Sequence, residues 1–357
     1  MTLIIAEAGV NHNGDERLAL KLIDSAYESG ADVVKFQTFK AKKLVTHNAT
    51  QADYQIANTG KKESQFAMLS RLELSYAAHH RLIAHCDNLG IKFLSTAFDS
   101  ESLTFLVDEL KLRLLKIPSG ELTNAPLILK HALTGCDLIV STGMATLAEV
   151  ESALSVIAFG LINHEGVEPS EAAFRLAYAS LEGQKALSEK VTLLHCTTEY
   201  PAPMNEINLR AMDTMRIAFN LPVGYSDHSL GVTIPVAAVA RGAVLIEKHF
   251  TLDRDMEGPD HKASLEPHEL KEMVNSIRDV EIALGNGIKT PQASEIKNKE
   301  IARKSLVAAK PIKKGDLFTR ENIEIKRPGN GSSPYNYWSI MGRSAVNEYI
   351  EGDVIIE

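Results

Sequence analysis

Short apolar runs alternate along most of the chain with segments whose apolar residues recur at helical spacing. The runs are four to six residues long and rich in Val, Ile and Leu, as is typical of strands buried on both faces. Eight of them are expected to be strands: residues 3–8, 33–38, 92–96, 114–117, 138–141, 191–195, 223–226 and 244–249. Amphipathic helices are expected between them, for instance over residues 17–29, 76–88 and 234–241.

This alternation predicts an α/β fold. Eight strands that alternate with helices fit a (β/α)₈ TIM barrel, and a doubly wound parallel sheet is the alternative. Helix signals support the alternation, since Thr146 and Glu149 form a capping box after the fifth strand. The barrel is expected to occupy residues 1–284, followed by a charged linker over residues 285–304.

Two connections are longer than usual. Residues 40–65 follow the second strand and are polar, so they are expected to form a lid over the catalytic face. Residues 160–190 precede the sixth strand and carry a helical pattern of their own over residues 171–187. That second insertion is expected to lie on the side or the bottom of the barrel.

Residues 305–357 differ in character from the rest. They contain short strand patterns at 305–309 and 323–327, and Gly-Asp turns at Gly315 and Gly352. A β-rich module of this size buries too little surface to be comfortably stable alone. It is therefore expected to dock on a barrel, either its own or that of a partner chain.

Composition narrows the possible functions. The 357 residues are 45% hydrophobic and 24% charged, with a net charge of -8. An acidic chain argues against binding to nucleic acid or to an anionic membrane. The three cysteines are widely spaced and the first residues lack the pattern of a signal peptide. A soluble, cytoplasmic protein without a disulfide framework is expected.

Polar residues cluster where the expected strands end, most densely in residues 244–262. In a barrel the carboxyl ends of the strands converge on one pocket. Lysines and hydroxyls at these ends would bind a small, highly charged anion, most simply a phosphate joined to a carboxylate. The set is Lys35, Thr96, Lys116, Ser119, Ser141 and Ser226.

Histidines follow the same logic. His228 and His249 end neighbouring strands and could share a divalent metal, for which Mn²⁺, Fe²⁺ and Zn²⁺ all remain open. His195 is expected to be a hydrogen-bonded core residue. Six other histidines fall on expected helices or loops and are expected at the surface: His79, His80, His85, His131, His164 and His268.

The strand-end motifs closely resemble those of the sialic acid synthase family, and the likeness spans nearly the whole chain. The matching segments are residues 6–14, 34–38, 116–121, 141–144, 224–228 and 247–251. The tail, with residues 326–331, resembles the antifreeze-like (SAF) domain of these enzymes. The family consists of transferases that condense phosphoenolpyruvate with an N-acylated mannosamine-type sugar to give a nine-carbon 2-keto acid.

The resemblance implies roles for individual residues. Phosphoenolpyruvate would bind to the lysines and hydroxyls named above, and Lys35 and Lys116 would stabilise its charges during the reaction. Glu121 would be an acid near the reacting centre, and His228 and His249 would hold Mn²⁺, which orients and polarises the sugar aldehyde. The sugar would contact Gln37, Tyr200, Glu247, Asp260 and Arg327. Because Arg327 matches an arginine that reaches into the partner subunit's site, a domain-swapped homodimer is implied.

Two departures concern the sugar. Asn13 stands where bacterial N-acetylneuraminate synthases have glutamate, and Thr198-Glu199 where they have asparagine and an apolar residue. The run of residues 196–203 looks more like that of N,N'-diacetyllegionaminate synthases, which use 2,4-diacetamido-2,4,6-trideoxymannose. N-acetylneuraminate synthase is the alternative. Two more distant hypotheses are a barrel aldolase or metallohydrolase that uses the same histidines, and a non-catalytic sugar-binding protein.

Overall fold

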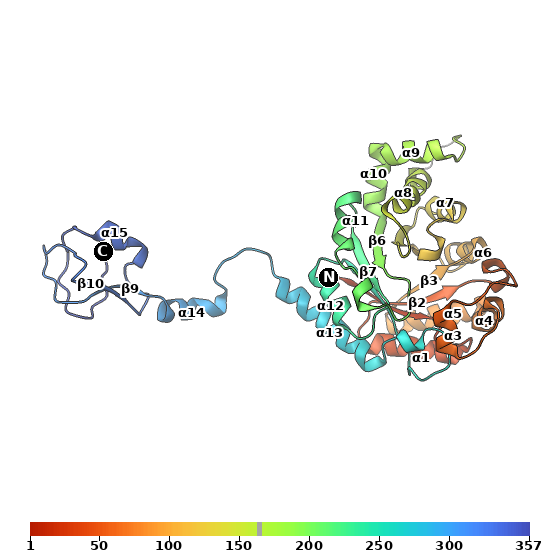
Figure 1. The fold of residues 1–357 in the computed structure, drawn as a ribbon, viewed down its shortest axis with the longest axis horizontal. Helices are drawn as coiled ribbons and strands as arrows, with labels where there is room; N and C mark the ends of the chain where they lie inside the picture. The colour runs from red at the N-terminus through yellow and green to blue at the C-terminus, as the bar shows by residue number, and fades with distance from the viewer. Residues whose placement is uncertain (163–165) are drawn as a thin grey trace. The chain divides into compact units, whose positions relative to one another are not determined.

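The computed structural model describes residues 1–162 and 166–357, and its first unit is a closed parallel barrel (Figure 1). Each strand pairs with the next, and the last pairs with the first from Leu3 opposite Leu245 to Glu7 opposite His249. This closure confirms the predicted TIM barrel and shows that the doubly wound alternative is wrong. The strands are β1 (Leu3–Gly9), β2 (Val33–Thr38), β3 (Lys92–Ala97), β4 (Leu114–Ile117), β5 (Asp137–Ser141), β6 (Val191–Cys196), β7 (Val223–Asp227) and β8 (Leu245–His249).

Helices surround the barrel, and side-chain caps explain where α1 and α8 begin. In α1 (Glu16–Glu28) the Asp15 side chain caps the first turn, and one face buries Leu22 and Ile23. The predicted capping box opens α8, since Thr146 N donates to Glu149 at 2.8 Å. The other barrel helices are α5 (Tyr76–Leu89), α6 (Ser100–Thr104), a π-helix η1 (Phe105–Glu109), η2 (Ser119–Glu121), α7 (Ala125–Leu133), α8 (Leu147–Ile162), η3 (Met204–Glu206), α11 (Ala211–Phe219), α12 (Thr233–Ala240), η4 (His261–Ala263) and α13 (Pro267–Leu284).

The two long connections form additional helices. The first contains α2 (Ala41–Leu44), α3 (Asp53–Thr59) and α4 (Gln65–Leu72). The second forms α9 (Glu171–Ala179) and α10 (Leu181–Lys190) beside α8, where the sequence predicts one helical segment. The break falls at Ser180, whose extended backbone and side-chain bond to Gly183 N start a new helix.

Two apolar clusters form the core of the barrel and its surrounding helices, as expected of this fold. A small cluster of Ile5, Val33, Leu94, Ile139, Leu194 and Leu245 packs together, while the larger one joins strands to the surrounding helices. Two histidines contradict the surface prediction: His79 and His131 are buried. Each lies within hydrogen-bond distance of a carbonyl four residues earlier, Ser75 O and Leu127 O respectively. His164 lies outside the described residues.

Residues Asn286–Glu357 form a second compact unit. It contains α14 (Ala293–Ala302), η5 (Pro334–Asn336) and α15 (Tyr337–Ile340), together with an antiparallel pair of strands, β9 (Ser305–Ala308) and β10 (Ile323–Lys326). Its own core includes Leu306, Phe318, Ile323 and Tyr349. Within the described parts of both units, no helix combines the length and apolarity needed to cross a membrane.

Candidate active site

Four charged side chains meet in the barrel interior at the carboxyl ends of the strands. Lys116 Nζ donates to both carboxylate oxygens of Glu247, at 2.7 and 2.8 Å. Lys35 Nζ lies 2.7 Å from Glu7 and 3.5 Å from Glu247. We call Glu7, Lys35, Lys116 and Glu247 the charge cluster. All four side chains are almost completely buried, with exposed fractions of 2 to 5%.

Strand register explains why these residues meet. Glu7 on β1 is the partner of Lys35 on β2, and Ser226 on β7 is the partner of Glu247 on β8. Hydroxyls from neighbouring strands complete the cluster, because Lys35 donates to Thr96 at 3.1 Å and Ser226 donates to Glu247 at 3.0 Å. Four of the six predicted lysines and hydroxyls, Lys35, Thr96, Lys116 and Ser226, are therefore brought together.

Burial and mutual attraction set the ionisation of the cluster. Burial raises the pKa of Glu7 to about 7, although Lys35 opposes the shift. Burial also acts on Glu247, but Lys116 and Lys35 outweigh it and lower the pKa of that carboxyl. Burial lowers the pKa of Lys116, whereas for Lys35 the carboxylates of Glu247 and Glu7 outweigh burial and raise the pKa. Within the charge cluster, Glu7 is thus the carboxyl whose pKa is raised toward neutral pH.

A second group of polar side chains lies beside the cluster, where β4 and β5 end. The backbone N–H of Gly143 donates to Ser119 Oγ at 3.0 Å, and Ser119 Oγ lies 3.2 Å from Cys196 Sγ. Ser141 ends β5 and is buried. A side chain at Gly143 would have its Cβ 2.2 Å from Thr198 Oγ1 and 2.8 Å from Ser119 Oγ. Only glycine permits this close approach.

A cavity of about 290 Å³ opens above the strand ends. It is lined by four residues expected at the sugar or the reacting centre, Gln37, Glu121, Tyr200 and Asp260, and by His249. Gln37 also bonds to Glu7 at 3.3 Å, which links the cavity to the charge cluster. Burial raises the pKa of Asp260 to about 6. Glu247, expected near the sugar, lies between the two lysines.

His228 and His249 lie close together, with ring centroids 5.5 Å apart. His228 Nδ1 is 2.6 Å from the carbonyl of Thr197, which can only accept, so Nε2 keeps its lone pair. His249 Nδ1 is buried without a hydrogen-bond partner among the described residues. Burial lowers the pKa of both rings, that of His228 to about 4. Two neutral imidazoles fit a divalent metal.

His228 Nε2 and His249 Nδ1 would supply only part of the ligand set of a divalent metal. Asp260 Oδ2 lies 3.8 Å from His249 Nδ1. Across residues 1–162 and 166–357, no three His, Cys, Asp or Glu side chains are arranged to hold a metal ion by themselves. The remaining ligands of an ion bound here would come from substrate or water.

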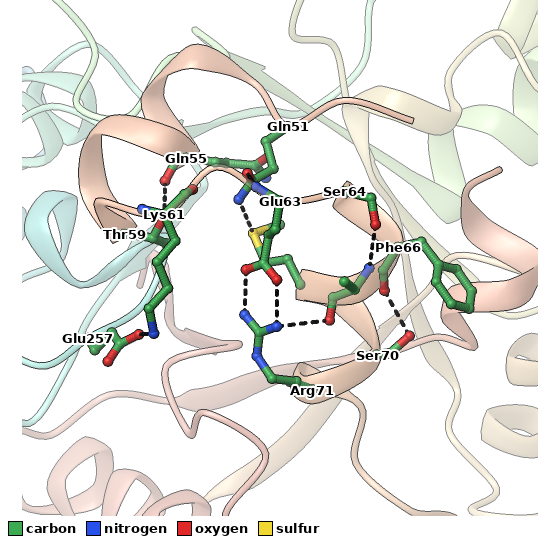
Figure 2. Close-up of polar contacts among 12 residues, drawn as sticks. Gln51, Gln55, Thr59, Lys61, Glu63, Ser64, Phe66, Ser70, Arg71 and Glu257 are labelled. Atoms are coloured by element: carbon green, nitrogen blue, oxygen red, sulfur yellow. Dashed lines mark hydrogen bonds and ion pairs between the residues drawn. The ribbon is translucent and has the colours of Figure 1, made fainter. Parts of the chain in front are cut away.

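The connection after β2 covers the cavity. Tyr54 and Gln55 of α3 line it, and the Tyr54 ring packs 5.0 Å from that of Tyr200. The loop after β8 receives polar contacts from this cover: Asn58 donates to Pro259 O at 2.7 Å, and Figure 2 shows Lys61 paired with Glu257. The structure thus places a cover where the sequence predicts a lid.

The two halves of the cover are held differently. In α4, Met68 and Leu72 pack with Val10 and Phe39 in an apolar cluster. Arg71 pairs with Glu63 just before that helix (Figure 2). In α3 the only buried side chain among the described residues is Gln55.

Asn13, expected near the sugar, bonds to the loop after β8. Its amide donates to Glu257 O at 2.8 Å and its oxygen is 3.3 Å from His261 Nε2. It lines a cavity of about 220 Å³ that shares Met68, Leu72 and Pro259 with the cavity above the strand ends. His261 Nδ1 in turn contacts Thr251 Oγ1 at 2.7 Å. Asn13 therefore fastens the loop after β8, which carries Asp260.

Arg327 belongs to the second unit, where it is exposed and donates to Ala302 O at 3.0 Å. Glu7 and Tyr54 received no role from the sequence. Glu7 could have been found as an acid inside a buried strand, whereas the position of Tyr54 depends on how the cover folds.

Comparison with known proteins places the chain in a family. The model of the NeuB family matches residues 22–289, and the SAF domain matches residues 303–355. The N,N'-diacetyllegionaminic acid synthase of Campylobacter jejuni is 51% identical over 356 residues, which cover 100% of this chain and 99% of that protein. The enzyme of the same name from Legionella pneumophila is 44% identical, covering 95% and 89%.

A solved structure agrees with these sequence matches. The N-acetylneuraminic acid (sialic acid) synthetase of Leptospira borgpetersenii is 32% identical, with a TM-score of 0.65 over 83% of this chain and 90% of that one. With a family model that spans most of the barrel and relatives that match over nearly their full length, the chain belongs to the NeuB family and ends in a SAF domain.

Proposed function

We propose that this nonulosonic acid synthase condenses phosphoenolpyruvate with 2,4-diacetamido-2,4,6-trideoxymannose to give N,N'-diacetyllegionaminate and phosphate. The full-length identity of 51% with the Campylobacter jejuni enzyme of that name carries the choice of sugar. N-acetylneuraminate synthase is the second candidate, favoured by the likeness to the Leptospira structure. The enzyme is expected to work in the cytoplasm, where phosphoenolpyruvate is made.

The charge cluster supports the binding of phosphoenolpyruvate. The substrate brings a phosphate and a carboxylate, and Lys35 and Lys116 are the buried cations that would receive them. Thr96, Ser119, Ser141 and Ser226 would donate hydrogen bonds to its oxygens. In the free enzyme Glu7 and Glu247 neutralise the lysines. Because the pKa of Glu7 is raised, proton uptake by this carboxyl would release Lys35 for the incoming anion.

The sugar would occupy the cavity above the cluster. Gln37, Tyr200 and Asp260 would orient it, and Glu121 would serve as the acid near the reacting centre. Carbon three of phosphoenolpyruvate forms a bond to the aldehyde carbon, whose oxygen takes up a proton. Water then adds to carbon two, and phosphate leaves as the C–O bond breaks. Both lysines would stabilise the anionic groups throughout.

His228 and His249 would hold the metal, for which we propose Mn²⁺. A bound divalent ion polarises and orients an aldehyde oxygen. The chain's own contribution is to keep both imidazoles neutral and to fix the ring of His228 through Thr197 O.

The choice of sugar is tested by phosphate release from phosphoenolpyruvate in the presence of Mn²⁺. We expect kcat/KM for the diacetamido sugar to exceed that for N-acetylmannosamine at least tenfold, about 1.4 kcal/mol in transition-state binding. The reverse preference would make the protein an N-acetylneuraminate synthase. Phosphate release with neither sugar would contradict both.

We further propose a homodimer in which Arg327 completes the partner subunit's site. Its exposure leaves the guanidinium accessible to a second chain. Arg327→Ala and His228→Ala should each be inactive alone. Mixed and allowed to exchange subunits, they should regain activity, since one site of each mixed dimer is then intact. Failure of the mixture to recover activity, with subunit exchange verified, would exclude completion in trans.

A further inference from the structure

An ion pair with no role in the proposed reaction lies in the barrel wall. Lys248 Nζ of β8 is 2.5 Å from Asp227 Oδ2 of β7, and neither side chain has any exposed surface. The two residues are direct register partners. Because side chains alternate along a strand, both point away from the face that carries Ser226 and Glu247. The pair therefore lies outside the catalytic interior.

Burial of this pair calls for an explanation. Removing two charges from water costs several kcal/mol per ion, and apolar residues of the same size often serve stability equally well. A buried ion pair does, however, fix register, since a slip of one residue would leave both charges buried and unpaired. The benefit of the ion pair would then be to fix the positions of the residues at the ends of β7 and β8.

The strand ends carry the two histidines. Asp227 precedes His228 and Lys248 precedes His249. The residue after His228, Ser229, is bound from both sides. Its backbone N–H and its hydroxyl each donate to Asp227 at 3.0 Å, and its carbonyl accepts from Lys248. Lys248, which precedes His249 on β8, thus bonds to the residue that follows His228.

We propose that Lys248 and Asp227 are positioning residues that hold His228 and His249 at the separation a shared divalent metal requires. The proposal rests on the metal role assigned to the histidines above. Without the ion pair, the end of β7 would be tied to β8 by fewer bonds, and the two rings would sample separations that do not suit one ion. Metal affinity, more than fold stability, is the property that should change.

The test uses a neutral double variant, Asp227→Asn with Lys248→Met. It leaves no uncompensated charge and keeps an oxygen to accept from Ser229 N, so the barrel should fold. Binding of Mn²⁺ to the full-length, metal-free protein is followed by the electron paramagnetic resonance signal of free Mn²⁺. We expect affinity to fall about 10- to 100-fold, as for other partners that orient metal ligands.

The matched control neutralises an ion pair elsewhere, Arg278→Met with Asp32→Asn. That pair is 2.7 Å long and partly exposed, and Arg278 also donates to Thr2 O near the start of β1 and to Glu281 at 3.0 Å, so the control removes at least as many contacts. A general loss of stability would weaken Mn²⁺ binding in both double variants alike. The proposal requires the control to bind Mn²⁺ as the parent does.

Outcomes separate this inference from the proposed function. A parent that binds no Mn²⁺, or a His228→Ala variant that binds it unchanged, would overturn the metal site itself. If the parent and His228→Ala behave as expected but the double variant binds Mn²⁺ with parental affinity, the positioning role would be overturned. Should the double variant not fold, Ser229→Ala removes one bond to Asp227 without changing charge. It should bind Mn²⁺ about threefold more weakly, and parental affinity would again refute the role.

Discussion

Replacing Lys116 by methionine tests the charge cluster directly. The change shortens the side chain by its terminal atom only and removes two hydrogen bonds to Glu247, of 2.7 and 2.8 Å. Removing one partner of a buried ion pair costs about 3 to 5 kcal/mol. Glu247 keeps Lys35 at 3.5 Å and Ser226 at 3.0 Å. We therefore expect the lower value, about 3 kcal/mol, for the loss in unfolding free energy.

A surface pair provides the control. Lys190 Nζ lies 2.9 Å from Asp137, almost the same distance, but these side chains are 40 and 58% exposed. Lys190→Met should show no measurable loss, because water already screens that pair. Urea denaturation followed by circular dichroism measures both variants. Equal losses would refute the reasoning that burial gives the Lys116 pair its strength.

The same variants separate stability from catalysis. Lys116 is expected to stabilise charge on phosphoenolpyruvate, and loss of one such group lowers rates about 10²- to 10³-fold. Lys116→Met should lower kcat/KM for phosphoenolpyruvate by that factor at temperatures where it is folded, and Lys190→Met should not. Near-parental kcat/KM for phosphoenolpyruvate in folded Lys116→Met would refute the role of Lys116 in stabilising charge on that substrate.

Three further predictions follow from the site. The pKa of Glu7 is raised to about 7, so the folded state binds more protons than the unfolded state between pH 4.5 and 7. This group's contribution to stability should therefore fall as pH rises through that window. Because ionised Glu7 competes with substrate for Lys35, KM for phosphoenolpyruvate should rise above pH 7, and a profile unchanged in Glu7→Gln would contradict this. Gly143→Ala should raise KM for phosphoenolpyruvate about tenfold, because the new Cβ would displace Ser119 and Thr198. Adding Thr198→Ala should lower that KM again in part, since it removes the closest contact. Absence of rescue would argue against a steric cause. Asn13→Asp keeps the oxygen that accepts from His261 and loses the donor to Glu257 O, so KM for both sugars should rise equally. A changed preference between the two sugars would indicate that residue 13 contacts the sugar directly.

Much of the barrel could be predicted from the sequence, because a buried parallel strand leaves a visible apolar run. The predicted run over 33–38 coincides with β2, and that over 244–249 differs from β8 by one residue. Polar residues at the ends of such strands are expected to converge once a barrel is assumed. That inference requires no knowledge of side-chain conformation.

Pairing within the site could not be predicted in the same way. Lys116 and Glu247 are 131 residues apart, and nothing in the sequence selects Glu247 over Glu7 as the carboxylate that holds both lysines. The buried histidines were missed for a local reason. His79 and His131 each satisfy Nδ1 within their own helix, and the further partner of His79, the Thr38 hydroxyl at 2.8 Å, is 41 residues away in the sequence.

The unequal attachment of the cover gives the site its own local folding equilibrium. Helix α3 has seven residues, too few to persist alone in water, and polar contacts that water can replace fasten it to the loop after β8. Helix α4 would remain in place, because its apolar face is packed. Amide hydrogens of α3 should therefore exchange with solvent far sooner than those of α4 or the strands. A substrate could then enter through a fluctuation of one short helix while the barrel stays folded.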